Sequence, residues 1–222
     1  LTGTSPPPGW SGKLWALEQG FANVRTNRTL LLDADIVLEP GILAALNKRM
    51  SRNQLHLVSV MARLRIENRW EKLLLPAFIY FFKLLYPFSL SNNPKSRVAA
   101  AAGGCVLIDT EALRSIGGFN SLRNAIIDDC TLARLVKTEG KQTWIGLSHD
   151  VRAIRPYESL TKIWDMVART AFTQLGYSIA MLGLCTVLLT LTFVIPTVGL
   201  LYGTGFVPFV ALVAFVAMGV SY

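Results

Sequence analysis

Hydrophobic positions near the start of the chain recur with a helical period. Residues 4 to 12, "TSPPPGWSG", form a Pro/Gly-rich stretch that predicts a loop. In the following stretch Leu14, Leu17 and Phe21 are spaced by three and four residues. This spacing predicts a helix over residues 13 to 24.

Two apolar runs then predict strands. Residues 29 to 32 read as a short buried strand, and the partly alternating, β-rich stretch from 55 to 66 reads as another. Between them, residues 41 to 50 are expected to be helical, with Glu39-Pro40 at the start because proline is tolerated in a first turn. Strand, helix and strand in this order indicate an α/β domain.

Residues 73 to 88, "LLLPAFIYFFKLLYPF", are strongly apolar. They number only sixteen and are interrupted by Pro76 and Lys83, whereas a spanning helix needs about twenty apolar residues. An interfacial helix on a bilayer is favoured over a helix of the protein core.

The second half of the chain begins with little side-chain bulk. Residues 98 to 108 read as a loop or strand, and Gly117-Gly118 interrupts the pattern. Residues 124 to 140 then predict a helix with Asp128 as N-cap and Gly140 at its end.

The last part of the chain is typical of a membrane protein. Residues 159 to 175 mix basic with aromatic residues and predict an amphipathic interfacial helix. Residues 176 to 202 predict a transmembrane helix, and residues 207 to 222 begin a second. We therefore expect one domain over residues 1–158, an amphipathic helix over 159–175 and a transmembrane region over 176–222.

The distribution of charge supports this division. The formal net charge is +8, yet every Asp, Glu, Lys, Arg and His lies at or before Arg169. Basic residues precede the first span and none follows it. The positive-inside rule places the first domain in the cytoplasm. We expect a multi-pass protein of the plasma (inner) membrane. No basic run is interleaved with aromatics, so nucleic acid is the weakest partner.

Asp33 and Asp35 are the first candidates for chemistry. Two carboxylates one residue apart on a strand point to the same side, at the strand end where α/β sheets bind ligands. Such oxygen donors suit Mg²⁺ or Mn²⁺ bound together with substrate phosphates. A turn and helix cap is the alternative role.

Asp128 and Asp129 form a second acidic pair. Both can serve as capping residues at a helix N-terminus, where negative charge is favoured. Alternatively, one caps the helix and the other faces the cleft as a general base, its pKa raised by its neighbour.

The remaining candidates are a lysine and two glycines. Lys13 follows the glycine-containing loop and can meet a phosphate oxygen, or it is a solvated surface residue. Gly103 and Gly104 let the backbone approach a ligand closely, or they form an ordinary tight turn. The three cysteines have no paired spacing and are expected to be free thiols in a reducing compartment.

In this order, these motifs resemble those of membrane-bound family 2 glycosyltransferases with a GT-A fold. The likeness runs through "SGKLWALEQG", "LLLDADIVLEPGIL", "AAAGGCVLIDTEALRSIGGF" and "IIDDCTLARLVK". It is closest to the hopene-associated glycosyltransferases, through "PPGWSGKLWAL", "AAAAGGCVLI", "IDDCTLAR" and "MVARTAFTQL". Ceramide glucosyltransferases resemble the chain more distantly.

The resemblance implies a role for each matching position. Asp33 and Asp35 would bind the divalent metal and the diphosphate of a nucleotide-sugar donor, and Asp129 would deprotonate the hydroxyl of a membrane-lipid acceptor. Asp128 would be the supporting carboxylate. Lys13 would lie near the donor, and Gly103 and Gly104 would form the loop beside donor sugar and acceptor. Arg169 would contact the diphosphate.

The chain also departs from the family pattern. The first strand and the nucleotide-base aspartate are expected to precede Leu1, so the sequence reads as an N-terminally truncated GT-A domain. The Q/RxxRW motif of related synthases is reduced to "MVART", which disfavours a polysaccharide synthase. A non-catalytic scaffold or lipid-binding protein that retains the fold is the other alternative.

Overall fold

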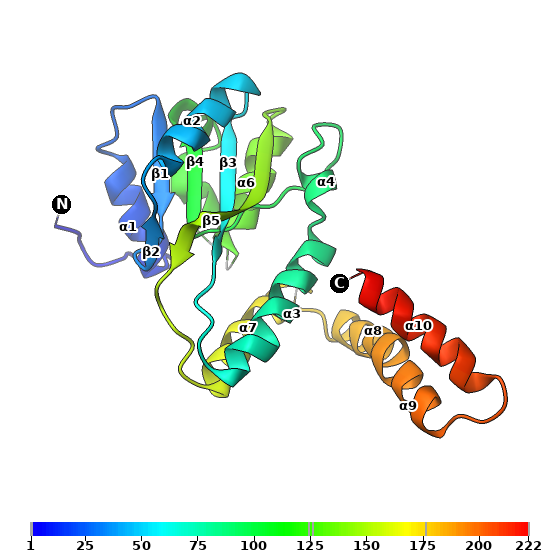
Figure 1. Ribbon diagram of the computed structural model, residues 1–222. Coiled ribbons are helices and arrows are strands. Elements are labelled where there is room, and N and C mark those ends of the chain that lie inside the picture. The colour runs from blue at the N-terminus through cyan, green and yellow to red at the C-terminus, as the bar shows by residue number, and fades with distance from the viewer. Residues whose placement is uncertain (1, 124, 126, 176, 222) are drawn as a thin grey trace. The chain divides into compact units, whose positions relative to one another are not determined.

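The predicted strands at residues 29 to 32 and 55 to 66 are confirmed as members of one mixed sheet. The structure is a computed structural model that describes residues 2–123, 125, 127–175 and 177–221, without the side chains of Arg169 and Ser221. Within these residues, five strands pair in the order β1-β4-β3-β5-β2 (Figure 1). Their bounds are β1 Arg28–Leu32, β2 Ile36–Leu38, β3 Leu57–Arg63, β4 Cys105–Asp109 and β5 Thr143–Ala153. Strand β3 is parallel to β5, and the other three pairings are antiparallel.

The two faces of the sheet bury different helices because side chains alternate along each strand. On one face α2 (Ile42–Arg52) presents Ile42, Leu46 and Met50 at intervals of four, and they pack against strand residues such as Val58 and Leu107. This spacing is the apolar stripe that a surface helix buries.

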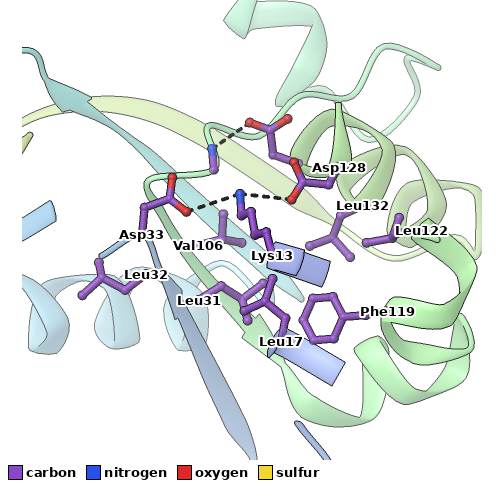
Figure 2. Close-up of a pocket in the computed structure, with 12 residues that line it drawn as sticks. Lys13, Leu17, Leu31, Leu32, Asp33, Val106, Phe119, Leu122, Asp128 and Leu132 are labelled. Atoms are coloured by element: carbon purple, nitrogen blue, oxygen red, sulfur yellow. Dashed lines mark hydrogen bonds and ion pairs between the residues drawn. The ribbon is translucent and has the colours of Figure 1, made fainter. Parts of the chain in front are cut away.

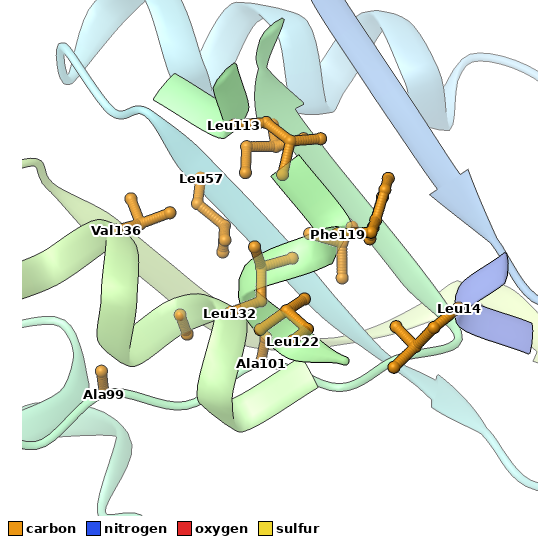
Figure 3. Close-up of a cluster of buried hydrophobic side chains, with 12 residues drawn as sticks. Leu14, Leu57, Ala99, Ala101, Leu113, Phe119, Leu122, Leu132 and Val136 are labelled. Atoms are coloured by element: carbon orange, nitrogen blue, oxygen red, sulfur yellow. The ribbon is translucent and has the colours of Figure 1, made fainter. Parts of the chain in front are cut away.

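The other face carries the larger apolar cluster (Figure 3). It draws side chains from α1 (Gly12–Phe21), α5 (Thr110–Ser115), the 3₁₀ helix η1 (Gly118–Leu122) and α6 (Asp128–Thr138). Leu14, Phe119 and Leu132 are almost completely buried there, beside Val106 and Ile108 of β4. This cluster therefore fixes the first turns of α1 and α6 against the sheet.

Two helix starts differ from the sequence prediction. Helix α2 begins at Ile42 after Gly41, whose φ of 89° is a left-handed conformation that favours glycine, so Glu39-Pro40 lies before the helix. Helix α6 has Ile127 as its N-cap, and no side chain forms a capping hydrogen bond there. Asp128, the predicted N-cap, is instead the first residue of the helix. The Asp128 carboxylate is thereby left available for other contacts. The predicted end at Gly140 is confirmed, with φ at 75°.

Strands β2 and β5 were not predicted. The short β2 exists through its antiparallel pairing with β5, and β5 through its parallel pairing with β3, so tertiary contacts rather than local pattern define both. The later residues of β5 are polar and largely exposed, which hides the strand from a search for apolar runs.

Helix α3 (Arg69–Leu85) confirms the predicted helix over most of residues 73 to 88, and α4 (Phe88–Ser91) follows it. It starts earlier than predicted because Asn68 and Glu71 form a capping box at its N-terminus. Leu75 is buried, whereas Leu73, Leu84 and Leu85 are more than half exposed. Its position on a bilayer stays a prediction.

The Glu71 carboxylate joins α3 to the segment that follows β5. It is fully buried and accepts backbone N–H bonds from Glu67, Asn68 and Tyr157 at 2.7–2.9 Å. The Asn68 side chain in turn donates to the Tyr157 carbonyl at 2.9 Å. Burial favours the neutral acid, but the three amide bonds outweigh it and lower the pKa of Glu71.

The contacts divide the chain into two units, Leu1–Ile163 and Trp164–Tyr222. Helix α7 (Leu160–Gln174) crosses this boundary, and the second unit continues with α8 (Ile179–Leu189), the π-helical turn η2 (Thr190–Val194), α9 (Ile195–Tyr202) and α10 (Val207–Ser221). The π turn immediately precedes the helix start that contains Pro196, which cannot donate a backbone N–H.

The run Ile179–Tyr202 is the one helix among the described residues that is long and apolar enough to cross a membrane, judged by length and composition. The apolar helix Val207–Val220 is shorter. The span predicted from sequence begins at Gly176, which lies outside the described residues.

We predict that Glu71→Ala destabilises the first unit. Three backbone N–H groups would lose their acceptor in a buried site, so Tm should fall by roughly 5 °C or more. Thermal unfolding in detergent, followed by tryptophan fluorescence, measures this. The matched control is Glu67→Ala, since Glu67 is exposed and its carboxylate pairs only with Arg65 among the described residues.

The loss of stability caused by Glu71→Ala is predicted to depend on pH. Because the folded-state pKa of Glu71 is lowered, its stabilisation is complete above the ordinary value of 4.5 and is lost as the pH falls through the folded value. The difference in Tm between wild type and Glu71→Ala should therefore narrow below about pH 4.5. An unchanged difference down to pH 3 would contradict a carboxylate role for Glu71.

Candidate active site

A single ammonium group joins two carboxylates that are far apart in the sequence. Lys13 Nζ, in the first turn of α1, lies 3.3 Å from Asp33 Oδ1 and 3.0 Å from Asp128 Oδ2 (Figure 2). Asp33 follows β1 and Asp128 opens α6. Three elements therefore bring charged groups together at one place.

The pKa of Lys13 reflects its position between the two acids. Burial lowers the pKa, but the charges of Asp128 and Asp33 and the hydrogen bonds to them raise it above 10.5 on balance. Lys13 is thus a fixed positive charge at neutral pH.

Asp129 points into the same site and is held by two backbone amides. Its Oδ2 accepts from Gly103 N at 2.7 Å, and its Oδ1 accepts from Cys130 N at 2.7 Å. Burial raises the pKa of Asp129, and so does the charge of Asp128, while the two amides and Lys13 lower it; the result is about 6. At neutral pH the group is ionised yet close to the range in which it can take up a proton.

The two glycines bring the loop before β4 close to these groups. A Cβ on Gly103 would lie 3.2 Å from Asp129 Oδ2 and 3.4 Å from Lys13 Nζ. A Cβ on Gly104 would lie 3.1 Å from Ile36 Cδ1, and the Gly104 carbonyl accepts from Asp33 N at 3.2 Å. The absence of side chains lets this loop contact both the Asp33 turn and α6.

Asp33 and Asp35 lie in a turn rather than on a strand. Strand β1 ends at Leu32, and Ile36 N donates to Asp33 O at 3.1 Å across the turn. The expectation that both carboxylates share one face of a strand is therefore wrong. Asp33 lines the cavity, whereas Asp35 is not among its lining residues and its carbonyl accepts from Ile154 N.

The cavity between these groups is small, about 30 Å³, which is room for little more than a water molecule. Its polar side is formed by Lys13, Asp33, Gly103 and the two aspartates of α6, and its apolar side by the core cluster behind them. The apolar lining consists of Leu17, Leu31, Leu32, Val106, Phe119, Leu122 and Leu132. The acidic pair thus faces a partly apolar wall.

The family was established by comparison of sequences. The model of the family described as glycosyltransferase-like family 2 matches residues 3–173, which contain all of these site residues. The chain belongs to glycosyltransferase-like family 2. The coarser part of the predicted resemblance is thereby confirmed, and the mixed α/β domain is GT-A-like.

Solved structures similar to this family 2 chain include two sugar-phosphoglycerate synthases. Mannosyl-3-phosphoglycerate synthase from Rubrobacter xylanophilus is 15% identical, with a TM-score of 0.40 over 76% of this chain and 51% of that one. Glucosyl-3-phosphoglycerate synthase from Mycobacterium tuberculosis is 17% identical, with a TM-score of 0.37 over 75% of this chain and 56% of that one. This chain spans about half the length of these structures. No curated protein matches it.

Glycosyltransferases of the GT-A type commonly use a divalent cation, for which the sequence predicts Asp33 and Asp35 as ligands. In the part of the chain that the structure describes, no cluster of three or more His, Cys, Asp or Glu forms a ready cation site. Mg²⁺ characteristically takes one or two carboxylates and completes its shell with water and substrate phosphates. Asp33 offers one carboxylate at the cavity, where its Oδ1 pairs with Lys13 at 3.3 Å, and Asp35 offers a second from the same turn but outside the cavity lining.

The remaining predicted residues are less informative. Arg169 lies in α7, but its side chain is outside the described residues. The cysteines are free, as predicted. Cys130 follows Asp129, yet burial, with a contribution from Asp129, raises its pKa to about 12, which excludes it as a nucleophile at neutral pH.

The apolar lining was missed by sequence reasoning. Phe119 and Leu122 come from η1, whose position over the site depends on the φ of 91° at Gly117 and 64° at Gly118. The Gly117-Gly118 pair predicts a break in the chain, but the sequence does not show that Phe119 and Leu122 line the site.

We predict that Lys13→Met raises the pKa of Asp129 above 6. Methionine keeps the length of the side chain but removes the positive charge that stabilises the Asp129 carboxylate. A ¹³C NMR titration of labelled aspartate carboxyls measures the effect. Lys48→Met on the exposed side of α2 is the control and should leave Asp129 unchanged. Equal pKa values for Asp129 in both variants would refute an electrostatic effect of Lys13 on Asp129.

Proposed function

We propose that the protein is an inverting glycosyltransferase that moves a sugar from a nucleotide-diphosphate donor to a hydroxyl group of a membrane lipid. The observation that carries this proposal is the partly buried Asp129 carboxylate, with a pKa of about 6, in one cavity with Lys13 and Asp33. Family membership supports the class of reaction, and the site geometry supports the roles proposed below.

Asp129 is the general base. Its two amide bonds fix the carboxylate in one orientation, and its pKa near 6 lets it hold a proton during the reaction and release it afterwards. Asp128 supports it in two ways: its negative charge raises the pKa of Asp129, and its carboxylate holds Lys13.

Lys13 stabilises negative charge on the donor side. Its ammonium is half exposed at the mouth of the site and contacts Asp33, the candidate metal ligand. A point charge in this position can bind a diphosphate oxygen. A side chain on Gly103 would crowd both Lys13 Nζ and Asp129 Oδ2, so glycine keeps these two groups free to meet the substrates.

Asp33 and Asp35 would hold Mg²⁺ or Mn²⁺. When bound there, such an ion acts as a Lewis acid and offsets negative charge on the departing nucleoside diphosphate.

The reaction is a single displacement. The acceptor oxygen forms a bond to the anomeric carbon as the bond from that carbon to the diphosphate oxygen breaks, so the configuration inverts. The acceptor's proton passes to Asp129, which later releases it to water. The apolar wall of Phe119, Leu122 and Leu132 limits access of water to this side of the site.

A lipid acceptor is supported by features outside the pocket. Leu73, Leu84 and Leu85 expose apolar surface on α3, and Lys72 and Lys83 on the same helix can keep their charges in the headgroup layer. Ile179–Tyr202 has the length and composition of a membrane span. We infer a plasma-membrane protein with its first unit in the cytoplasm, because basic residues precede that helix.

The sequence resemblance supports a narrower acceptor. The likeness to hopene-associated glycosyltransferases favours a hopanoid-type lipid hydroxyl, and the more distant likeness to ceramide glucosyltransferases favours another lipid alcohol. Both are amphiphiles whose hydroxyl stays near the headgroups.

The proposal is tested by incubating membranes that carry the protein with a panel of nucleotide sugars and extracted lipids, with and without Mn²⁺ or Mg²⁺. We expect metal-dependent release of a nucleoside diphosphate and a glycolipid detectable by mass spectrometry. Asp35→Ala should abolish the metal-dependent release of the nucleoside diphosphate. Failure of every donor, together with no metal-dependent nucleotide binding, would instead indicate a non-catalytic scaffold.

We predict that Asp129→Asn lowers kcat by roughly 10²–10⁴-fold and leaves donor binding nearly unchanged, because the amide cannot take up the proton. Steady-state kinetics and nucleotide binding measure the two effects. Asp150→Asn, which changes an exposed aspartate, is the control. In the wild type, kcat/KM should rise about tenfold from pH 5 to pH 7, with half of the change near pH 6. An Asp129→Asn enzyme with the wild-type kcat would exclude Asp129 as the base.

A further inference from the structure

One buried hydroxyl in the sheet has no part in the site as described so far. Strand β3 is buried from Leu57 to Met61, and Ser59 is the polar side chain in that run, with no exposed surface. Its partners across the two strand pairings are Val106 of β4 and Ile145 of β5. A polar group in such surroundings lowers stability unless its hydrogen bonds are satisfied.

Ser59 forms its hydrogen bonds with the loop that precedes β4. Its Oγ accepts from Ala102 N at 2.8 Å and can donate to Ala102 O at 3.1 Å or to Cys105 O at 3.4 Å. A hydroxyl has one proton, so it donates to one carbonyl at a time, and the shorter distance favours Ala102. Both backbone polar groups of Ala102 are thus held by one side-chain oxygen.

These bonds determine the orientation of the next N–H. The carbonyl of Ala102 and the N–H of Gly103 belong to one planar trans peptide group, in which they point in opposite directions. Ser59 therefore holds one edge of this peptide, and the other edge donates to Asp129 Oδ2 at 2.7 Å.

The alternation of β3 places Ser59 on the side of the sheet where this contact is needed. Val58 and Val60 pack in the cluster under α2, whereas Leu57 packs in the cluster with α1 and α6. Ser59, two residues after Leu57, faces the same side.

We propose that Ser59 is a positioning residue that orients the Ala102–Gly103 peptide so that its N–H fixes the Asp129 carboxylate. The proposal rests on the proposed role of Asp129 as the base. Ser59 itself does not touch the reacting atoms and acts through one rigid peptide group.

The test compares Ser59→Ala with Thr29→Val. Thr29 Oγ1 and Thr110 Oγ1 form another buried hydroxyl pair, 2.8 Å apart, at the far end of β1 from Asp33. Both substitutions remove a buried hydroxyl from the same sheet, but only Ser59→Ala releases the loop. Ser59→Cys keeps nearly the volume of serine with a weak hydrogen-bonding sulfur, and it serves if Ser59→Ala fails to fold.

In membranes that carry each variant, kcat should fall at least about tenfold in Ser59→Ala and Ser59→Cys, with little change in the KM for the donor. In the pH profile of kcat/KM, the midpoint of the rise on the acid side should move above pH 6, because the Gly103 amide that lowers the pKa of Asp129 is displaced. Thr29→Val should have the pH profile of the wild type, even if its Tm falls as much as that of Ser59→Ala. A Ser59→Ala enzyme with the wild-type kcat and pH profile would overturn the proposal.

Hydrogen–deuterium exchange decides the positioning role without an activity assay. The amides of residues 102 to 104 should exchange faster in Ser59→Ala and Ser59→Cys, and at the wild-type rate in Thr29→Val. Wild-type exchange in both Ser59 variants would refute the structural part of the proposal. If exchange is faster while the wild-type protein transfers no sugar, the proposed function fails and Ser59 still holds the loop.

Discussion

The ion pairs of Lys13 with Asp33 and Asp128 are the interaction on which the site depends. They join the first turn of α1, the end of β1 and the first turn of α6. The apolar cluster behind them brings these three elements together, since Leu14 and Leu132 are buried in it next to the charged residues. Without the lysine, carboxylates would face one another across a small cavity and repel, which costs free energy in a partly buried site.

The sequence allowed prediction of much of this architecture because local patterns are strong where helices bury one stripe. The helices at α1, α2, α3 and α6 were predicted within a few residues at each end, and so were β1 and β3. Strands β2 and β5 were missed because pairing rather than composition defines them. The residues that meet in the site were identified from motifs, whereas the contact between Lys13 and Asp128 required the tertiary structure.

The sequence also did not reveal the roles of individual polar side chains. Asp128 was expected to cap α6, yet its carboxylate binds Lys13 instead. Ser59 lies in an apolar strand, and Glu71 belongs to the capping box that precedes an apolar run, but each also satisfies backbone groups from a distant segment. Such residues are visible only when the loops they hold are in place, because the partner is a backbone amide that any residue could supply.

A crystal structure with Mn²⁺ and a nucleoside diphosphate, read by anomalous scattering, tests most directly whether these carboxylates form one donor and acceptor site. The predicted result is a manganese ion coordinated by carboxylate oxygens of Asp33 or Asp35, with Lys13 on the diphosphate. Asp129 should remain on Gly103 N and free of metal. A manganese ion bound by Asp128 and Asp129, or bound away from Asp33 and Asp35, would contradict the division of the site into a metal side and a base.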